Sequence, residues 1–152
     1  MSNDPFMITL HNYINGQLIP PSSGKYLDSI NPATGKVHAQ VPDSDSKDVE
    51  LAYEAASMAF PKWSELPAPE RSSYLLKIAA RIEQRLEELA KAESDDNGKP
   101  LALARRVDIP RARDNFRYFA QAITQFHSEA YDMGQTGFNY TLRRPIGVAG
   151  LI

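Results

Sequence analysis

The sequence predicts an α/β protein in which short β-hairpins come first, helices follow, and β structure returns at the end. Three features lead to this prediction: turn signals between apolar pairs near the start, helix-period apolar stripes over roughly 45–127, and an apolar run over 146–152. A chain of 152 residues is long enough for one compact domain, since that length buries roughly 68–70% of the surface of the unfolded chain.

The first elements are predicted to be two hairpins within residues 1–43. Apolar pairs flank Asn15-Gly16, a dipeptide that favours the positive-φ positions of a type I′ turn. The stretches Tyr26–Ile30 and Val37–Val41 bracket a second turn at 31–35, where proline presets φ and glycine closes the turn.

Three helical stretches are predicted next. The first runs from Asp45, a good N-cap, to about Phe60, and Pro61 is expected to end it. The second covers about 69–94, with Glu87 and Lys91 as an i,i+4 pair, and Gly98 supplies its C-terminal stop.

The third helical stretch, about 101–127, contains Pro110. Because a proline inside a helix removes a donor and clashes with the preceding turn, we expect a break near 107–109, with Asp108 capping the second half. The residues expected to face the core are Phe116, Phe119, Ile123 and Phe126.

The end of the chain is predicted to be β structure. Residues 138–143 alternate loosely, and 146–152 form an apolar run typical of a buried parallel strand. A buried strand needs neighbours on both sides and crossover helices, and none follow in this sequence, so a truncated fold is expected.

The composition excludes several function classes. Hydrophobic residues make up 42%, and 17 basic against 19 acidic side chains leave a net charge of −2, so no nucleic-acid partner is indicated. The first residues lack the pattern of a signal peptide, and no apolar run approaches the roughly 20 residues of a membrane span; we expect no membrane partner and a cytoplasmic location. The absence of cysteine excludes disulfides and a cysteine nucleophile within these residues.

Two polar groups are candidates for chemistry. Asp95-Asp96 precedes the Gly98 turn and is either a solvated loop or an oxygen donor to a hard cation. Arginines cluster around Pro110: Arg105, Arg106, Arg111, Arg113 and Arg117. They could form a solvated helix face or ion pairs with glutamates. Alternatively, one of them could bind a substrate carboxylate. The histidines show no metal-ligand spacing.

The ordered motifs of the chain resemble the N-terminal region of the aldehyde dehydrogenase superfamily. They are Tyr13-Ile-Asn-Gly16, Asn31-Pro-Ala-Thr-Gly-Lys-Val37, Ala55-Ala-Ser-Met-Ala-Phe60 before Trp63, Pro69-Glu-Arg71, Asp96-Asn-Gly-Lys-Pro100 and Arg144-Pro-Ile-Gly-Val148. The resemblance implies that 1–137 belongs to the NAD-binding domain, that 138–145 is an oligomerisation-sheet strand, and that 146–152 begins a Rossmann-like core.

The segment 101–120 narrows the resemblance to the branch that acts on 2-aminomuconate or 2-hydroxymuconate 6-semialdehyde, in tryptophan or aromatic-ring catabolism. In that branch the arginine after Ile-Pro, here Arg111, binds the substrate carboxylate, and Val107 is expected beside it in the substrate site. A carboxylate-bearing aldehyde needs a cation where enzymes for neutral aldehydes place an apolar residue.

The resemblance also assigns other sites. Asp96, with a backbone carbonyl of Ser29 or Ile30, is expected to hold a structural Na⁺ or K⁺, and Ile152 is expected to line the NAD adenosine pocket. The strand 138–144 is expected to join subunits of a homo-oligomer. The family's catalytic cysteine, glutamate and asparagine have no counterpart here, so this chain is expected to carry no catalytic residue and no activity of its own.

Two alternatives stay open. The substrate could be a neutral aldehyde, against which Arg111 argues. The chain could also be a non-catalytic binding module that pairs with full-length subunits by edge addition through 138–144.

Overall fold

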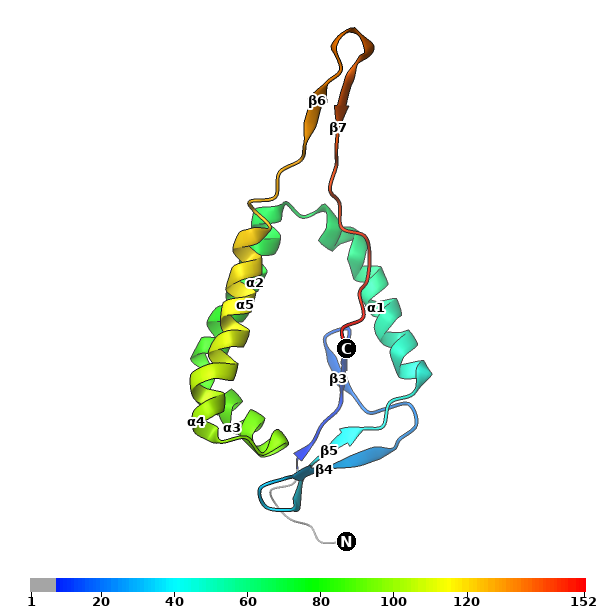
Figure 1. Cartoon of the computed structure of the whole chain (residues 1–152). Helices are drawn as coiled ribbons and strands as arrows, with labels where there is room; N and C mark the ends of the chain where they lie inside the picture. The colour runs from blue at the N-terminus through cyan, green and yellow to red at the C-terminus, as the bar shows by residue number, and fades with distance from the viewer. Residues whose placement is uncertain (1–7) are drawn as a thin grey trace.

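The computed structural model describes residues 8–152, and the expectations for residues 1–7 lie outside this range. The elements form an open arrangement, in which helix α1 lies on one side and helices α2 and α5 run together on the other (Figure 1). A small sheet lies at one end, and the hairpin β6–β7 projects at the opposite end.

Both predicted N-terminal hairpins are confirmed. Strands β2 (Asn12–Ile14) and β3 (Gln17–Ile19) pair antiparallel around Asn15 and Gly16, whose φ angles of 51° and 78° are those of a type I′ turn. Strands β4 (Tyr26–Asn31) and β5 (Lys36–Pro42) also pair antiparallel, and β1 (Ile8–Thr9) adds to β5 in parallel.

The β4–β5 ladder contains a bulge that matters for the site. Ser29 pairs with Ala39, whereas Ile30 pairs with Val37, so His38 is the extra residue on β5. A bulge bends the strand and redirects the side chain at that position. This irregularity was not predicted from the sequence.

Helix α1 (Ser46–Glu65) begins where predicted and ends later. Asp45 caps it, and Asp48 closes a reciprocal capping box. The Asp48 carboxylate is buried and also accepts from the backbone N–H and hydroxyl of Ser22, and the backbone N–H lowers the pKa of Asp48. The expected stop at Pro61 is wrong: the last turn continues past it because Trp63 packs edge-to-face on Tyr74 of the next helix at 5.5 Å.

The predicted single helix over 69–94 is two helices, α2 (Ala68–Gln84) and α3 (Leu86–Asn97), which meet at Arg85. The bend at Arg85 lets α3 pack on strand β4 and on the turn after Gly98, and tertiary packing of this kind overrides helix propensity. Gly98 ends α3 with a φ of 75°, as predicted. The predicted Glu87–Lys91 ion pair is wrong, because Glu87 pairs with Arg105 and Lys91 pairs with Asp95.

Pro110 does not break the third helical stretch. Helices α4 (Leu101–Leu103) and α5 (Ile109–Ala122) are joined by a π-helical turn, η1 (Ala104–Asp108). The N–H of Ile109 donates to the carbonyl of Ala104, five residues back, so the wide turn absorbs the missing proline donor. Asp108 is itself helical and makes no capping bond, which corrects its predicted role.

The C-terminal prediction is partly wrong. Strands β6 (Ala130–Asp132) and β7 (Phe138–Tyr140) form an antiparallel hairpin around a short 3₁₀ turn, η2 (Gly134–Thr136), and β6 was not predicted. Residues 146–152 form no strand, and Ile146 and Leu151 are fully exposed. An isolated strand has no ladder partner to satisfy its backbone, and the described chain offers none here.

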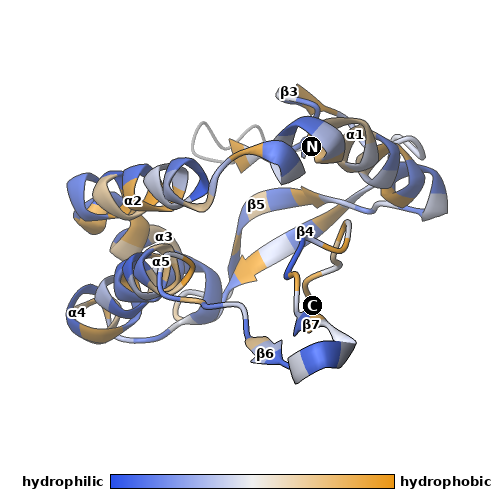
Figure 2. Cartoon of the chain, turned by 90° about the horizontal axis from the view of Figure 1, so that it is seen from above, coloured by the Kyte–Doolittle hydropathy of each residue, from blue (hydrophilic) through white to orange (hydrophobic). Residues whose placement is uncertain are grey.

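The buried apolar residues between 8 and 152 are all alanines: Ala39, Ala79, Ala90, Ala104 and Ala120. Helices α2 and α5 pack closely through Ala79 and Ala120, and the Ser72 hydroxyl donates to the Ala120 carbonyl at 2.6 Å. The expected core positions Phe116, Phe119 and Phe126 are exposed, and Ile123 is half-buried. Hydrophobic stretches recur along the helices and the sheet instead of gathering in one core (Figure 2).

Candidate functional site

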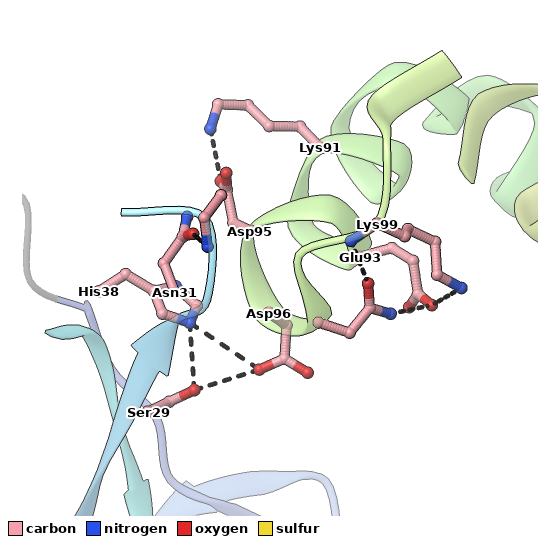
Figure 3. A network of polar contacts seen from close by, with 10 residues as sticks. Ser29, Asn31, His38, Lys91, Glu93, Asp95, Asp96 and Lys99 are labelled. Carbon is pink, nitrogen blue, oxygen red and sulfur yellow. Dashed lines mark hydrogen bonds and ion pairs between the residues drawn. The ribbon is translucent and has the colours of Figure 1, made fainter. Parts of the chain in front are cut away.

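The bulged strand and the end of α3 bring three polar side chains together. The Ser29 hydroxyl lies 3.1 Å from Nε2 of His38 and donates to Oδ1 of Asp96 at 3.2 Å, and the same carboxylate oxygen is 3.8 Å from His38 (Figure 3). His38 is the bulged residue of β5 and lies next to Ser29, and Asp96 comes from the end of α3, just before the Gly98 cap. Ile30 is the next residue on β4 after Ser29, and the bulged residue His38 of β5 lies between their two ladder partners.

This cluster has the parts of a serine hydrolase triad but not its arrangement. In a triad the carboxylate binds the ring nitrogen that faces away from the serine. Here Asp96 approaches Ser29 and the same Nε2 of His38. Nucleophilic catalysis by Ser29 is therefore not supported, and the cluster is a hydroxyl and an imidazole nitrogen beside one exposed carboxylate.

A cavity of about 720 Å³ lies beside the cluster, between the sheet and α3. Its lining combines apolar side chains with charged ones. The residues that line it are Ile8, Leu10, Ser29, His38, Ala39, Val41, Glu88, Lys91, Ala92, Glu93, Asp95 and Asp96. Within residues 8–152 no group of three or more histidine or acidic side chains is arranged to hold a metal ion.

The arginine cluster divides into paired and unpaired members. Arg105 pairs with Glu87, and both Arg113 and Arg117 pair with Glu83. Arg106 and Arg111 have no carboxylate within ion-pair distance in the described part of the chain. Arg111 is exposed on the first turns of α5, and Val107, four residues earlier, is exposed on η1.

Lys99 ties the end of α3 to the π turn. Its ammonium lies 2.8 Å from a carboxylate oxygen of Glu93 and 2.8 Å from one of Asp108, and all three side chains are half-buried. These bonds raise the pKa of Lys99, with Asp108 contributing most. Lys99 is thus held as a cation between two carboxylates.

Comparison with known proteins identifies the family. A model described as "Aldehyde dehydrogenase family" matches residues 18–152. The chain belongs to the aldehyde dehydrogenase family. The resemblance and the mixed α/β fold expected from the sequence are confirmed.

The relatives of this aldehyde dehydrogenase chain include the 2-aminomuconic semialdehyde dehydrogenases of Bos taurus and Homo sapiens. They are 49% and 47% identical over 96% and 100% of this chain, which spans 30% and 31% of their own lengths. The NAD⁺ complex of an aldehyde dehydrogenase from Bacillus cereus superposes with a TM-score of 0.83 at 34% identity, covering 87% of this chain and 27% of that one.

The other predicted site residues of this family member lie in different parts of the structure. Asp96 was predicted to hold a cation with the backbone carbonyl of Ser29 or Ile30, and the contact present is a hydrogen bond from the Ser29 hydroxyl to Asp96. Ile152 lies in the terminal segment, which forms no helix or strand, and its side chain is fully exposed. In residues 8–152 no helix is long and apolar enough to cross a membrane.

Sequence reasoning missed His38 and Lys99. His38 had no ligand spacing, and the bulge that directs it depends on ladder register, which local sequence does not specify. Lys99 lies inside the Asp96-Asn-Gly-Lys-Pro100 motif, and its position next to a turn could have pointed to a structural role. Its partner Asp108, however, was predicted to be a helix N-cap.

Proposed function

We propose that this chain supplies the substrate carboxylate site of an NAD-dependent dehydrogenase that oxidises a carboxylate-bearing semialdehyde, 2-aminomuconate or 2-hydroxymuconate 6-semialdehyde, to the acid. The observation that carries the proposal is Arg111, an exposed arginine with no carboxylate partner in the described chain, next to arginines that are paired. The printed names of the bovine and human relatives support the same substrate class.

Arg111 suits this role because its guanidinium presents parallel N–H donors that match a carboxylate. Val107 supplies apolar surface one turn away, which would contact the carbon chain of the substrate. An arginine already paired with a protein carboxylate would have to break that pair first, so the unpaired state of Arg111 favours substrate binding.

The test is Arg111→Ala in the intact enzyme, meaning the whole protein that carries this chain. Loss of a charge-assisted interaction should raise KM for 2-hydroxymuconate 6-semialdehyde by about 10- to 100-fold, and KM for the neutral aldehyde hexanal should change little. Arg106→Ala, which removes the other unpaired arginine of the cluster around Pro110, is the matched control and should leave both values unchanged.

A neutral aldehyde as the natural substrate predicts the opposite result. In that case Arg111→Ala would leave the KM ratio of the two substrates as it is, and the proposed substrate class would be wrong. Equal effects of the Arg106 and Arg111 variants would also contradict it, because a general loss of positive charge would then explain the change.

Cofactor and cation binding belong to the same proposal. NAD as the cofactor is supported by the NAD⁺ complex of the Bacillus cereus relative, and Ile152 is proposed to line the adenosine pocket. The contact between Ser29 and Asp96 supports a site for Na⁺ or K⁺, with a backbone carbonyl of Ser29 or Ile30 as a further ligand.

Assembly is the last part of the proposal. Hairpin β6–β7 projects from the helices with all residues of both strands exposed (Figure 1). A projecting strand with unpaired backbone groups is suited to edge addition, either between identical subunits or onto a full-length subunit. We propose that residues 138–144 join the subunits of a homo-oligomer, whose mass should fall when this edge is blocked.

A further inference from the structure

Asp108 and Asp114 are the acidic residues nearest to Arg111 along the helix, each three positions away, and Asp114 is paired with Arg113 and Arg117. That leaves Asp108, and residues three apart are neighbours on a helix surface. The acidic residue also comes first, which is the favourable order for an ion pair. Arg111 nevertheless has no ion pair with Asp108.

Other arginines of the chain do take such nearby carboxylates. Arg85 pairs with Glu88 at the same spacing of three, and Arg113 pairs with the adjacent Asp114 at 2.8 Å. An unpaired arginine three positions from an aspartate is therefore unusual in this chain and needs a cause.

The position of Lys99 explains why Asp108 does not pair with Arg111. Its ammonium lies 2.8 Å from Oδ2 of Asp108 and is also bonded to Glu93 at 2.8 Å. Figure 3 shows the contact between Lys99 and Glu93. Its backbone is also fixed, because its N–H donates to the Asn97 side chain and its carbonyl accepts from the Ser94 hydroxyl. The backbone and the ammonium of Lys99 are thus both held in place beside Asp108.

We propose that Lys99 is a positioning residue that neutralises Asp108 and thereby keeps Arg111 free for the substrate carboxylate. The inference rests on the proposed function of Arg111. Without Lys99, Asp108 captures the Arg111 guanidinium, and its uncompensated negative charge also repels the substrate carboxylate. Both effects weaken binding of charged substrates only.

The experiment measures KM and kcat of the intact enzyme for 2-hydroxymuconate 6-semialdehyde and for hexanal. Lys99→Met, which keeps the length of the side chain, should raise KM for the semialdehyde about two- to fivefold, the range of partly exposed ion pairs. Its kcat and the KM for hexanal should stay unchanged. Lys91→Met, the same change at the exposed partner of Asp95, is the control and should move neither KM.

Asp108→Asn separates this role from simple support of the π turn. If Lys99 acts by neutralising Asp108, then Asp108→Asn alone leaves the semialdehyde KM at the unaltered value, and adding it to Lys99→Met restores that value. A raised KM in Asp108→Asn, or no recovery in the double variant, overturns the inference. This test also holds if Lys99→Met does not fold, because Asp108→Asn alone gives an answer.

Arg111→Ala keeps the two proposals apart. If Arg111→Ala raises the semialdehyde KM and Lys99→Met does not, only the role of Lys99 is wrong. If Arg111→Ala has no effect, the proposed function fails instead. The inference also requires that Lys99→Met has no further effect in the Arg111→Ala background, and a persisting effect contradicts it.

Discussion

At the scale of single residues, adjacent aspartates have different surroundings. Asp95 pairs with Lys91 one turn back on α3, so its charge is compensated within the helix. Asp96 faces the Ser29 hydroxyl and Nε2 of His38 across the gap to the sheet. Of these two aspartates, Asp96 alone has no lysine or arginine partner in residues 8–152. It also lies next to a strand whose carbonyls could complete a cation site.

This difference predicts a cation effect on stability that depends on Asp96. The intact enzyme should unfold at a higher temperature in NaCl or KCl than in tetramethylammonium chloride of equal ionic strength. A cation present at about ten times its Kd stabilises by about 1.4 kcal/mol. Asp96→Asn should abolish the difference between the salts, and Asp95→Asn, the matched control, should retain it. An undiminished salt difference in Asp96→Asn would remove the cation site from the proposal.

Residues whose role depends on local backbone chemistry could be predicted from the sequence. Asn15-Gly16 and Gly98 adopt the positive φ that their turns require, and Asp45 caps the helix that follows it. The partners of His38 and Lys99 could not be predicted, because they depend on a ladder bulge and on the docking of α3 against η1. Long-range contacts of this kind leave no periodic signal.

At the scale of elements, the two interior prolines show why helix ends were misplaced. Pro61 was expected to stop α1 and Pro110 to break the third helix, and neither does so. A proline removes one donor and crowds one turn. The Trp63–Tyr74 contact holds the last turn of α1, and the π turn widens the helix before Pro110. In each case a structural feature that helix propensity does not describe determined where the helix ends.

The hairpin β6–β7 yields a prediction at the same scale. Thr141 donates to Glu129 and Met133 donates to Gly137 across the hairpin. Because bonded and non-bonded pairs alternate in an antiparallel ladder, the Tyr140 N–H, paired opposite Ala130, points to the open edge. Tyr140→Pro removes this outward donor and should lower the mass of the assembly in analytical ultracentrifugation.

Tyr140→Ala is the control for this change, because it removes the aromatic ring and keeps the N–H. It should retain more of the assembly than Tyr140→Pro. Equal masses for the unaltered protein and the proline variant would show that subunits do not join through the edge of β7.

At the scale of the molecule, the described chain buries little apolar surface. Its buried apolar residues are alanines, while large side chains on every helix longer than one turn remain at least partly exposed. Since burial of large apolar side chains is the main favourable term in folding, these faces need cover from other protein surfaces. The chain spans about 30% of the length of its bovine relative, which agrees with this need.

The resemblance implies that family chemistry uses a cysteine thiolate that attacks the aldehyde, and this sequence contains no cysteine. We therefore predict that the purified chain, incubated with NAD and 2-hydroxymuconate 6-semialdehyde, forms no NADH above the rate without protein. The intact enzyme, assayed alongside, should form NADH in proportion to its concentration. Arg111 can position a carboxylate but supplies neither a nucleophile nor a hydride acceptor. NADH formation that rises with the concentration of the chain, and that survives repurification, would place catalysis within these residues and contradict the division of roles proposed for them.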